Sequence, residues 1–248
     1  MLDSALLDYL DGLHVALDPS ARFERVIGEP DGWQRDFLCS TSEFALVLCS
    51  RQVGKSTSTA CLAWAAMSLG LMVLIVAPSE RQSKELLRKI IDFKNADAAA
   101  PRVIRSTLTE LELANGGRCL VAPASSDTIR GFTVDLLIVE EAAFVPDDVI
   151  TAILPMRKES GRVVMISTPA GRQGIFYELW QAGKVHRIFA RSVDIPRLTA
   201  KVDFDRRFMP LVKFRQEHLC EFLGSGTPFF DPLSLEDAIN TNSKALVL

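Results

Sequence analysis

Short apolar runs alternate along this chain with longer stretches in which hydrophobic residues recur every three or four positions. Continuous runs rich in β-branched residues indicate buried strands, whereas the longer period indicates helices with one apolar face. Strands are predicted over residues 44–49, 71–77, 135–139, 162–167 and 186–190. Helices are predicted over residues 1–18, 33–38, 56–69, 79–95, 146–154, 175–181 and 204–222. This alternation predicts an α/β fold in which helices flank a mostly parallel central sheet.

Two stretches depart from simple alternation. Residues 110–114 and 118–122 flank Asn-Gly-Gly at 115–117, which is typical of a β-hairpin. Residues 60–77 are apolar for long enough to suggest a membrane span. However, Gly70 separates a helical part from a β-branched part, so we interpret the run as a buried helix followed by a buried strand.

The first 18 residues are predicted to form an amphipathic helix. Its apolar positions are Leu6, Leu7, Leu10 and Leu13. A helix of this kind serves either internal packing or the docking of a partner. Because the segment is acidic, it is not expected to act as a signal peptide.

Composition narrows the class of protein further. The chain has 248 residues, of which 48% are hydrophobic, enough for one large α/β domain. Its net charge is −3 without a block of like charges, so charge does not indicate a nucleic-acid partner, although a local basic patch stays open. Five cysteines lack C-x-x-C spacing, which indicates neither a disulfide framework nor a zinc site and is typical of a reducing, intracellular setting.

Candidate chemistry begins between the strand over 44–49 and the helix that follows it. The loop reads SRQVGKS and resembles the phosphate-binding Walker A loop in its strand, Gly-Lys-Ser, helix order. Gly54 lets the backbone approach a phosphate, Lys55 would reach the β- and γ-phosphates, and Ser56 would ligate Mg²⁺. The residues expected around the nucleotide are Ser50, Arg51, Gln52, Val53, Gly54, Lys55, Ser56 and Thr57. The full pattern asks for Gly where this chain has Cys49, and a chance Gly-Lys-Ser is the alternative.

Two carboxylates follow the most apolar strand, as in a Walker B motif. Glu140 and Glu141 come directly after Leu-Leu-Ile-Val at 136–139. Ligands of open α/β sheets bind at the carboxyl ends of the strands. Glu140 would therefore hold Mg²⁺ through water, and Glu141 would polarise the attacking water. Ordinary surface acids after a strand are the alternative, which the order of the two motifs disfavours.

Small hydroxyl residues end the next predicted strand. Ser167 and Thr168 could hydrogen-bond a γ-phosphate or the attacking water and so sense hydrolysis. An ordinary exit from the strand is the alternative.

Six segments between residues 33 and 222 resemble the ATPase domain of the large terminase subunit, the DNA-packaging motor of tailed bacteriophages. The segments are WQRD at 33–36, SRQVGKS at 50–56, SSDTIRG at 125–131, LLIVEEAAF at 136–144, STPAG at 167–171 and FRQEHLCEF at 214–222. Terminases often lack the first Gly of the loop, so Cys49 agrees with this family. Glu140 stands where Asp is commoner.

The resemblance implies roles for three further residues. Gln34 resembles the glutamine that reads adenine, with a polar helix residue as the alternative. Arg51 resembles an arginine that acts on the phosphates in cis, and its charge would repel Lys55 without an anion. Arg130 resembles an arginine finger presented to a neighbouring subunit, with an ordinary turn arginine as the alternative.

The implied fold is that of a RecA-like P-loop NTPase of the ASCE class over residues 1–224. Residues 225–248 would form a linker towards a nuclease domain outside this chain, so nuclease activity is not expected. The implied function is ATP hydrolysis with Mg²⁺ that drives double-stranded DNA into a procapsid. The implied partners are DNA, other copies in a homo-oligomeric ring, the portal protein and the small terminase subunit, with no membrane. The implied location is the host cytoplasm, docked transiently on the procapsid.

Two other functions stay open. One is a helicase-like ATPase that tracks along nucleic acid, although the chain lacks an Asp-Glu-x-His box and a second RecA-like domain. The other is a non-catalytic nucleotide-binding switch for assembly, which the presence of both Glu140 and Glu141 disfavours.

Overall fold

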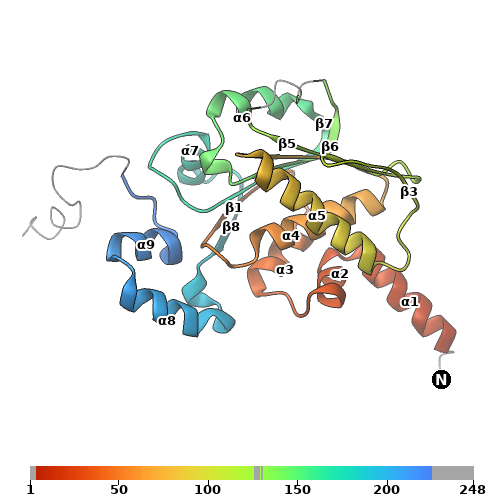
Figure 1. Ribbon diagram of the computed structural model, residues 1–248, viewed down its shortest axis with the longest axis horizontal. Helices are drawn as coiled ribbons and strands as arrows, with labels where there is room; N and C mark the ends of the chain where they lie inside the picture. Colours follow the sequence, from red (N-terminus) through yellow and green to blue (C-terminus); the bar gives the residue numbers. More distant parts are fainter. Residues whose placement is uncertain (1–3, 126–128, 130, 225–248) are drawn as a thin grey trace, which may run out of the picture.

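A computed structural model describes residues 4–125, 129 and 131–224 of the chain. Within this part, eight strands form one sheet in the order β3-β4-β5-β2-β6-β7-β1-β8 (Figure 1). The strands are β1 (Phe44–Cys49), β2 (Met72–Ala77), β3 (Val103–Ser106), β4 (Glu110–Leu113), β5 (Arg118–Pro123), β6 (Val134–Glu140), β7 (Arg157–Ser167) and β8 (His186–Ala190). Six neighbouring strands pair in parallel, namely β5, β2, β6, β7, β1 and β8. At the edge of the sheet, β4 pairs antiparallel with both β5 and β3. The predicted α/β fold with a mostly parallel sheet is confirmed.

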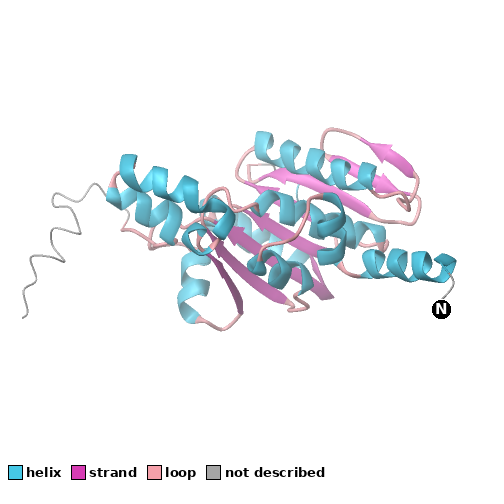
Figure 2. Cartoon of the chain, turned by 90° about the horizontal axis from the view of Figure 1, so that it is seen from below, coloured by secondary structure: helices cyan, strands magenta, loops and turns pink. Residues whose placement is uncertain are grey.

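Helices cover both faces of the sheet. They are α1 (Ser4–Leu17), α2 (Pro19–Val26), α3 (Gly32–Cys39), α4 (Lys55–Ser68), α5 (Glu80–Ala96), α6 (Asp147–Ile153), α7 (Ile175–Ala182), α8 (Thr199–Phe208) and α9 (Leu211–Leu219). Helices α3, α4 and α5 pack on one face, and α6 and α7 on the other (Figures 1 and 2).

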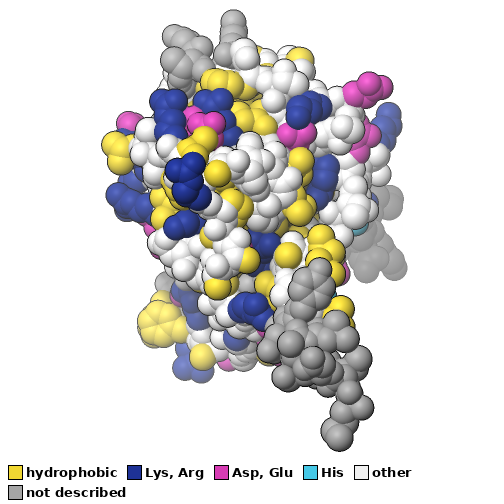
Figure 3. Space-filling model, turned by 90° about the vertical axis from the view of Figure 1, so that its right-hand side faces the viewer, with side chains coloured by type: hydrophobic (Ala, Val, Ile, Leu, Met, Phe, Trp, Pro, Cys, Tyr) yellow, Lys and Arg dark blue, Asp and Glu magenta, His cyan; other side chains and the backbone are white. Residues whose placement is uncertain are grey.

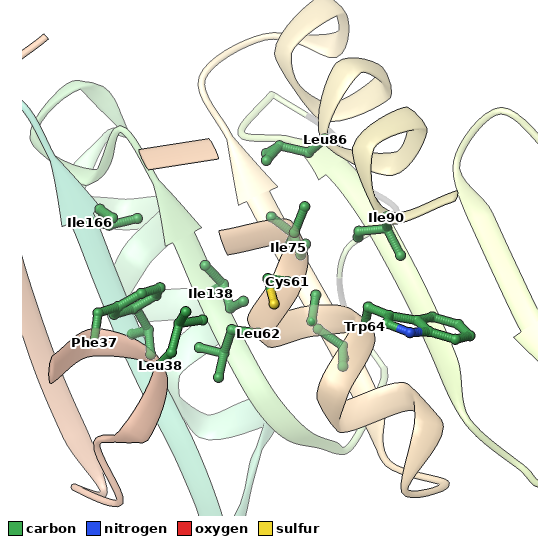
Figure 4. Close-up of a cluster of buried hydrophobic side chains, with 14 of the residues drawn as sticks. Phe37, Leu38, Cys61, Leu62, Trp64, Ile75, Leu86, Ile90, Ile138 and Ile166 are labelled. Atoms are coloured by element: carbon green, nitrogen blue, oxygen red, sulfur yellow. The ribbon is translucent and has the colours of Figure 1, made fainter. Parts of the chain in front are cut away.

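The two faces of the sheet have separate hydrophobic cores because successive strand residues point to opposite sides. In β6, Ile138 joins the core under α3, α4 and α5, whereas Val139 joins the core under α6 and α7. Figure 4 shows Trp64 of α4 and Ile90 of α5 packed in the first of these cores. Parallel strands buried on both faces explain why the strand sequences are almost continuously apolar.

The apolar run over 60–77 is divided between α4 and β2, as predicted. Gly70 separates them with φ +83°, a conformation that favours glycine. Among the described residues, none of the helices is both long and apolar enough to cross a membrane. The predicted hairpin is also present, as β4 and β5.

The prediction of one continuous helix over 204–222 is wrong. The structure has α8 and α9 with a break at Met209, whose φ −93° and ψ 138° are extended. Pro210 follows, and a proline disfavours helical backbone in the residue before it.

The prediction also missed β3 and the start of β7. β3 has only four residues and pairs at the edge of the sheet, where Ile104 is exposed, so it carries no apolar run. β7 begins at Arg157 with charged, exposed residues before its buried part. Both segments lack the burial on which a hydrophobic pattern depends.

Candidate nucleotide-binding site

The loop between β1 and α4 has the backbone that close approach of a phosphate requires. Gln52 has φ 59° and Gly54 has φ +99°, both in the left-handed region. A Cβ on Gly54 would lie 2.8 Å from Gln34 Nε2, so only glycine fits without displacing its neighbour. The first N–H groups of α4 lie at the end of this loop, where a helix favours an anion.

Glu140 lies at the carboxyl end of β6, bonded to two hydroxyls of α4. Ser56 Oγ donates to Glu140 Oε1 at 2.8 Å, and Thr59 Oγ1 donates to Glu140 Oε2 at 3.0 Å. Burial raises the pKa of the Glu140 carboxyl, and the neighbouring Glu141 adds to this, whereas Lys55 and the two hydroxyls act in the opposite direction. A divalent cation would offset the same desolvation.

The oxygen atoms of Ser56 and Glu140 suit Mg²⁺. Hard oxygen ligands are what Mg²⁺ prefers, and it commonly takes one or two protein ligands together with substrate phosphates. Among the residues that the structure describes, no group of three or more His, Cys, Asp and Glu side chains is placed to hold a metal alone. Because Mg²⁺ commonly shares its ligands with substrate phosphates, Ser56 and Glu140 fit a metal held together with a nucleotide.

Glu141 connects the loop with the end of β7. Its Oε1 lies 2.9 Å from Lys55 Nζ, in a pair whose lysine is almost fully buried. Its Oε2 accepts from the Thr168 N–H at 3.3 Å and the Thr168 hydroxyl at 3.2 Å, and Ser167 Oγ lies at 3.5 Å. Glu141 also has φ 51°, an unfavourable conformation for a non-glycine residue that recurs at functional sites.

The structure thus brings together the predicted residues of the loop, the β6 end and the β7 end. Lys55, Ser56, Glu140, Glu141, Ser167 and Thr168 form one connected cluster. Because β6 and β7 are parallel neighbours, their carboxyl ends meet at one edge of the sheet.

Gln34 is buried between α3 and α4. Its Oε1 accepts from the Asp31 N–H at 2.9 Å, and its Nε2 donates to Ser58 Oγ at 3.0 Å. Both ends of the side chain therefore have partners within the protein, and they hold α3 against the phosphate-loop helix.

A cleft of about 570 Å³ adjoins the loop on this side. Asp31, Trp33, Phe189, Ile195 and Arg197 are among its lining residues. Arg197 pairs with Asp31 at 2.6 Å and donates to the Val53 carbonyl at 2.8 Å. The cleft is therefore attached directly to the loop and is wide enough for part of a nucleotide.

Arg51 has a partner that the sequence did not reveal. The Arg51 guanidinium pairs with Glu217 Oε2 at 2.9 Å, and the backbone N–H of Arg51 donates to the Glu217 carbonyl at 3.1 Å. The expectation that Arg51 repels Lys55 unless an anion is present is therefore wrong, because Glu217 of α9 balances its charge. The Arg51 side chain is 69% exposed and accessible from solvent.

A buried polar network fixes Ser50 to α8 and α9, and sequence reasoning missed it. Ser50 Oγ donates to the His218 carbonyl at 2.8 Å and accepts from the Ser192 N–H at 3.0 Å. The His218 ring lies between Ser192 Oγ at 2.8 Å from Nδ1 and Asp205 Oδ2 at 3.1 Å from Nε2. Burial lowers the pKa of His218, and Asp205 opposes this. The segment 214–222 carried the only sequence signal, and it gave no role for His218.

Arg130, the predicted arginine finger, lies outside the described residues. So does the predicted linker over 225–248.

The chain matches a family model described as RNA cytidine acetyltransferase NAT10/TcmA, helicase domain, over residues 46–181. Its fold is also similar to that of solved large terminases. The Thermus phage P74-26 large terminase ATPase domain is 25% identical, with a TM-score of 0.70, over 84% of this chain and 100% of that one.

The HK97 bacteriophage large terminase is 18% identical, with a TM-score of 0.68, over 89% of this chain. The large terminase of a thermophilic bacteriophage, in complex with ADP, is 14% identical, with a TM-score of 0.57, over 86% of this chain. The chain spans 58% and 53% of these two longer proteins. Large terminase ATPase domains therefore share its fold, as the six sequence segments predicted.

Proposed function

This chain belongs to the family described as RNA cytidine acetyltransferase NAT10/TcmA, helicase domain, and on that premise we propose that its site hydrolyses ATP with Mg²⁺. The similarity to a large terminase ATPase domain extends the proposal to ATP-driven movement along DNA. The chain is an ATPase of the P-loop type, as are its structural relatives. The observation that carries the proposal is the Glu141 carboxylate, held between Lys55 and Thr168 at the end of the phosphate loop.

Each residue of the cluster has a separate task in this proposal. Bound ATP and Mg²⁺ supply the cleavable phosphate and a counter-charge for its oxygens. Ser56 would ligate the metal, and Glu140 would hold it through water. Glu141 orients the attacking water and accepts its proton, while Thr168 and Ser167 keep the carboxylate in place.

The Lys55–Glu141 pair gives this site an order of events. In the structure Lys55 and Glu141 are paired with each other, so neither is free to meet a substrate group. Phosphate oxygens compete for Lys55 and release Glu141 beside the water. Glu141 is therefore free to orient the water only after the nucleotide has bound.

The nucleotide base is assigned to the cleft beside Asp31 and Arg197. In this arrangement Gln34 does not contact the base but supports the cleft by holding α3 against α4. Arg51 would leave Glu217 and reach the phosphates from the solvent side. Arg130 is proposed as the finger that completes the site of a neighbouring subunit.

The biological role that we propose is the packaging of double-stranded DNA into a procapsid by a homo-oligomeric ring. The similarity to the Thermus phage P74-26 ATPase domain over most of this chain supports it. The portal protein and the small terminase subunit are the expected partners, and the expected location is the host cytoplasm. The match to a helicase-domain family favours a second candidate, an ATPase that tracks along nucleic acid in the manner of a helicase.

ATP turnover measured with double-stranded DNA, single-stranded DNA or RNA separates these functions. A packaging motor is expected to be stimulated by double-stranded DNA. Stimulation by single strands alone would favour the helicase-like function, and nucleotide binding without turnover would favour an assembly switch.

Mixing two inactive variants tests the proposed finger. Arg130→Ala chains have an intact pocket, and Glu141→Gln chains have an intact finger. Co-assembled chains are expected to regain activity that neither variant has alone. An assembled but inactive mixture would remove Arg130 from the mechanism.

A further inference from the structure

The start of the phosphate loop is held by the last turn of α9. The final carbonyl groups of a helix have no partner within the helix and are open to other donors. Here the Arg51 N–H donates to the Glu217 carbonyl at 3.1 Å, and Ser50 Oγ donates to the His218 carbonyl at 2.8 Å. Because Ser50 is fully buried, no water can replace its bond. The position of the loop therefore depends on this turn of α9.

The ring of His218 orients the same turn from inside the protein. Lys, Arg, Asp and Glu side chains reach the surface at the end of the molecule that Figure 3 views. His218 is only 4% exposed instead, and its ring stacks on Phe214 with the ring centres 4.7 Å apart. Nδ1 lies 2.8 Å from Ser192 Oγ, and Nε2 lies 3.1 Å from Asp205 Oδ2. Partners on both nitrogen atoms fix the plane of the ring.

Aspartate, histidine and serine in contact resemble the catalytic triad of a hydrolase. However, Ser192 is 2% exposed and does not line the hollow of about 480 Å³ that Asp205 and His218 border. A nucleophile has to reach its substrate, so the cluster is not a second active site. The hollow does give solvent protons a route to the ring.

The Asp205 carboxylate decides which ring nitrogen carries the proton. Lys201 Nζ donates to Asp205 Oδ2 at 2.9 Å and holds the pKa of this carboxyl below its usual value. An ionised carboxylate only accepts hydrogen bonds, so Nε2 of His218 carries the proton. Nδ1 of the neutral ring is then an acceptor for the Ser192 hydroxyl. This bond turns the Ser192 hydroxyl away from the His218 carbonyl and leaves the carbonyl to Ser50.

A proton on Nδ1 reverses this arrangement. Nδ1–H then donates to Ser192 Oγ, and the hydrogen of the Ser192 hydroxyl needs a new acceptor. The His218 carbonyl lies 3.5 Å from Ser192 Oγ and already accepts from Ser50. Because all three residues are buried, no water offers an alternative. Sharing the carbonyl weakens the bond that holds Ser50 and with it the start of the loop.

The surroundings of the ring favour its neutral form. Burial lowers the pKa of His218, Asp205 opposes this, and Lys201 adds to the lowering. A free histidine has a pKa of about 6.5, so the lowered value leaves the ring neutral at pH 7. Ser192 presents an uncharged hydroxyl to the ring. The charged groups around the ring come from α8, α9 and the phosphate loop, namely Asp205, Lys201, Arg206, Lys213, Glu217 and Arg51.

We propose that His218, with its ring neutral, is a positioning residue for the phosphate loop, because it turns the Ser192 hydroxyl away from the carbonyl that holds Ser50. The inference rests on the proposed nucleotide site and adds a proton-sensitive support to it. His218 contacts the start of the loop and not Glu141, so its protonation is expected to raise KM for ATP and leave kcat nearly unchanged. A purely structural role would lower the fraction of active protein, which reduces kcat at constant KM.

Nitrogen-15 NMR of the histidine rings tests the proton positions directly. The chain has three histidines, and the exposed His14 and His186 serve as internal references. Wild-type His218 is expected to show a protonated Nε2 and an unprotonated Nδ1 at pH 7. Asp205→Asn is expected to move the proton towards Nδ1, because an amide can donate to Nε2. Lys201→Gln is the matched control, since it keeps the carboxylate. A wild-type ring with a protonated Nδ1 at pH 7 would overturn the proposal.

The affinity for an ATP analogue tests the consequence for the loop. His218→Asn places an amide oxygen near the position of Nδ1 and cannot be protonated, so its affinity at pH 7 is expected to stay within about threefold of wild type. His218→Leu has no acceptor there and is expected to bind about tenfold more weakly, the effect of one lost hydrogen bond. Between pH 7 and about pH 5.5, wild type is expected to lose about tenfold more affinity than His218→Asn. Equal pH dependence in these two proteins would overturn the proposal, even if His218→Leu does not fold.

ATP turnover measured on the same samples separates this inference from the proposed function. Nucleotide affinity that follows the protonation of His218 without any turnover contradicts the proposed hydrolysis alone. Turnover with the same KM in wild type, His218→Asn and His218→Leu contradicts the role of His218 alone. A lower kcat at constant KM in His218→Leu would likewise show that His218 only supports the fold.

Discussion

The two sides of the phosphate loop are built in different ways. On the β6 side, buried charges meet, with Lys55 paired to Glu141 and Glu140 bonded to two hydroxyls. On the α8–α9 side, the exposed Arg51 meets Glu217, and a hydrogen bond to a backbone carbonyl fixes Ser50. The β6 side depends on strands whose positions are set by the sheet, whereas the other side depends on two short helices joined at Pro210.

This difference has an energetic consequence. Removing one member of a buried ion pair costs about 3–5 kcal/mol because the remaining charge stays buried. An exposed pair contributes about 0–1 kcal/mol and is screened by salt. The β6 side is therefore suited to hold catalytic groups in fixed positions, and the α8–α9 side is suited to open and close as nucleotide binds and leaves.

A large loss of turnover is expected from Lys55→Ala. The substitution removes the ammonium group that would bind phosphate and that pairs with Glu141. Turnover is therefore expected to fall by at least about 10²–10³. Steady-state ATP hydrolysis measures this, and Lys184→Ala, an exposed lysine before β8, is the control. Loss of cooperative unfolding in Lys55→Ala would show that Lys55 is mainly structural.

Glu140→Gln is expected to separate stability from metal binding. Burial raises the pKa of Glu140 because it disfavours the charged carboxylate. The free energy of unfolding therefore falls as the pH rises and the buried carboxyl ionises. The neutral amide should therefore raise the melting temperature of the nucleotide-free protein at pH 7. The Mg²⁺ concentration for half-maximal turnover should rise about tenfold or more. An unchanged Mg²⁺ requirement would remove Glu140 from the metal site.

A smaller effect is expected from Arg51→Ala. If Arg51 acts on the phosphates in cis, turnover should fall about tenfold even in the monomer, because a charge-assisted contact is lost. Glu217→Gln is the matched variant, since it frees Arg51 without removing it. Equal losses in both variants would mean that Arg51 only holds α9, whereas a loss in Arg51→Ala alone supports contact with the phosphates.

The same two sides explain what the sequence could predict. Glu140, Glu141 and Thr168 lie at or next to a strand end, and Ser56 lies in the first turn of the helix that follows β1. The parallel topology brings these strand ends together. The partners on the other side are not local in this sense. Ser50 and Ser192 are 142 residues apart in the chain, and Ser50 and His218 are 168 apart.

Those distant contacts depend on where α8 and α9 pack, which periodicity does not determine. The predicted single helix over 204–222 would have kept Asp205 and His218 several turns apart. The break before Pro210 instead folds α9 back so that both residues meet. The Glu217 partner of Arg51 was missed for the same reason.

The most direct test of the central claim is ATP binding and hydrolysis by Glu141→Gln, with Glu24→Gln as an exposed control. The amide keeps the shape of the side chain but is a very weak base, so the account predicts ATP-analogue affinity within about threefold of wild type and turnover reduced by about 10²–10⁴. Glu24→Gln should match wild type in both. Normal turnover in Glu141→Gln with unchanged nucleotide affinity would contradict the assignment of Glu141 as the residue that activates water.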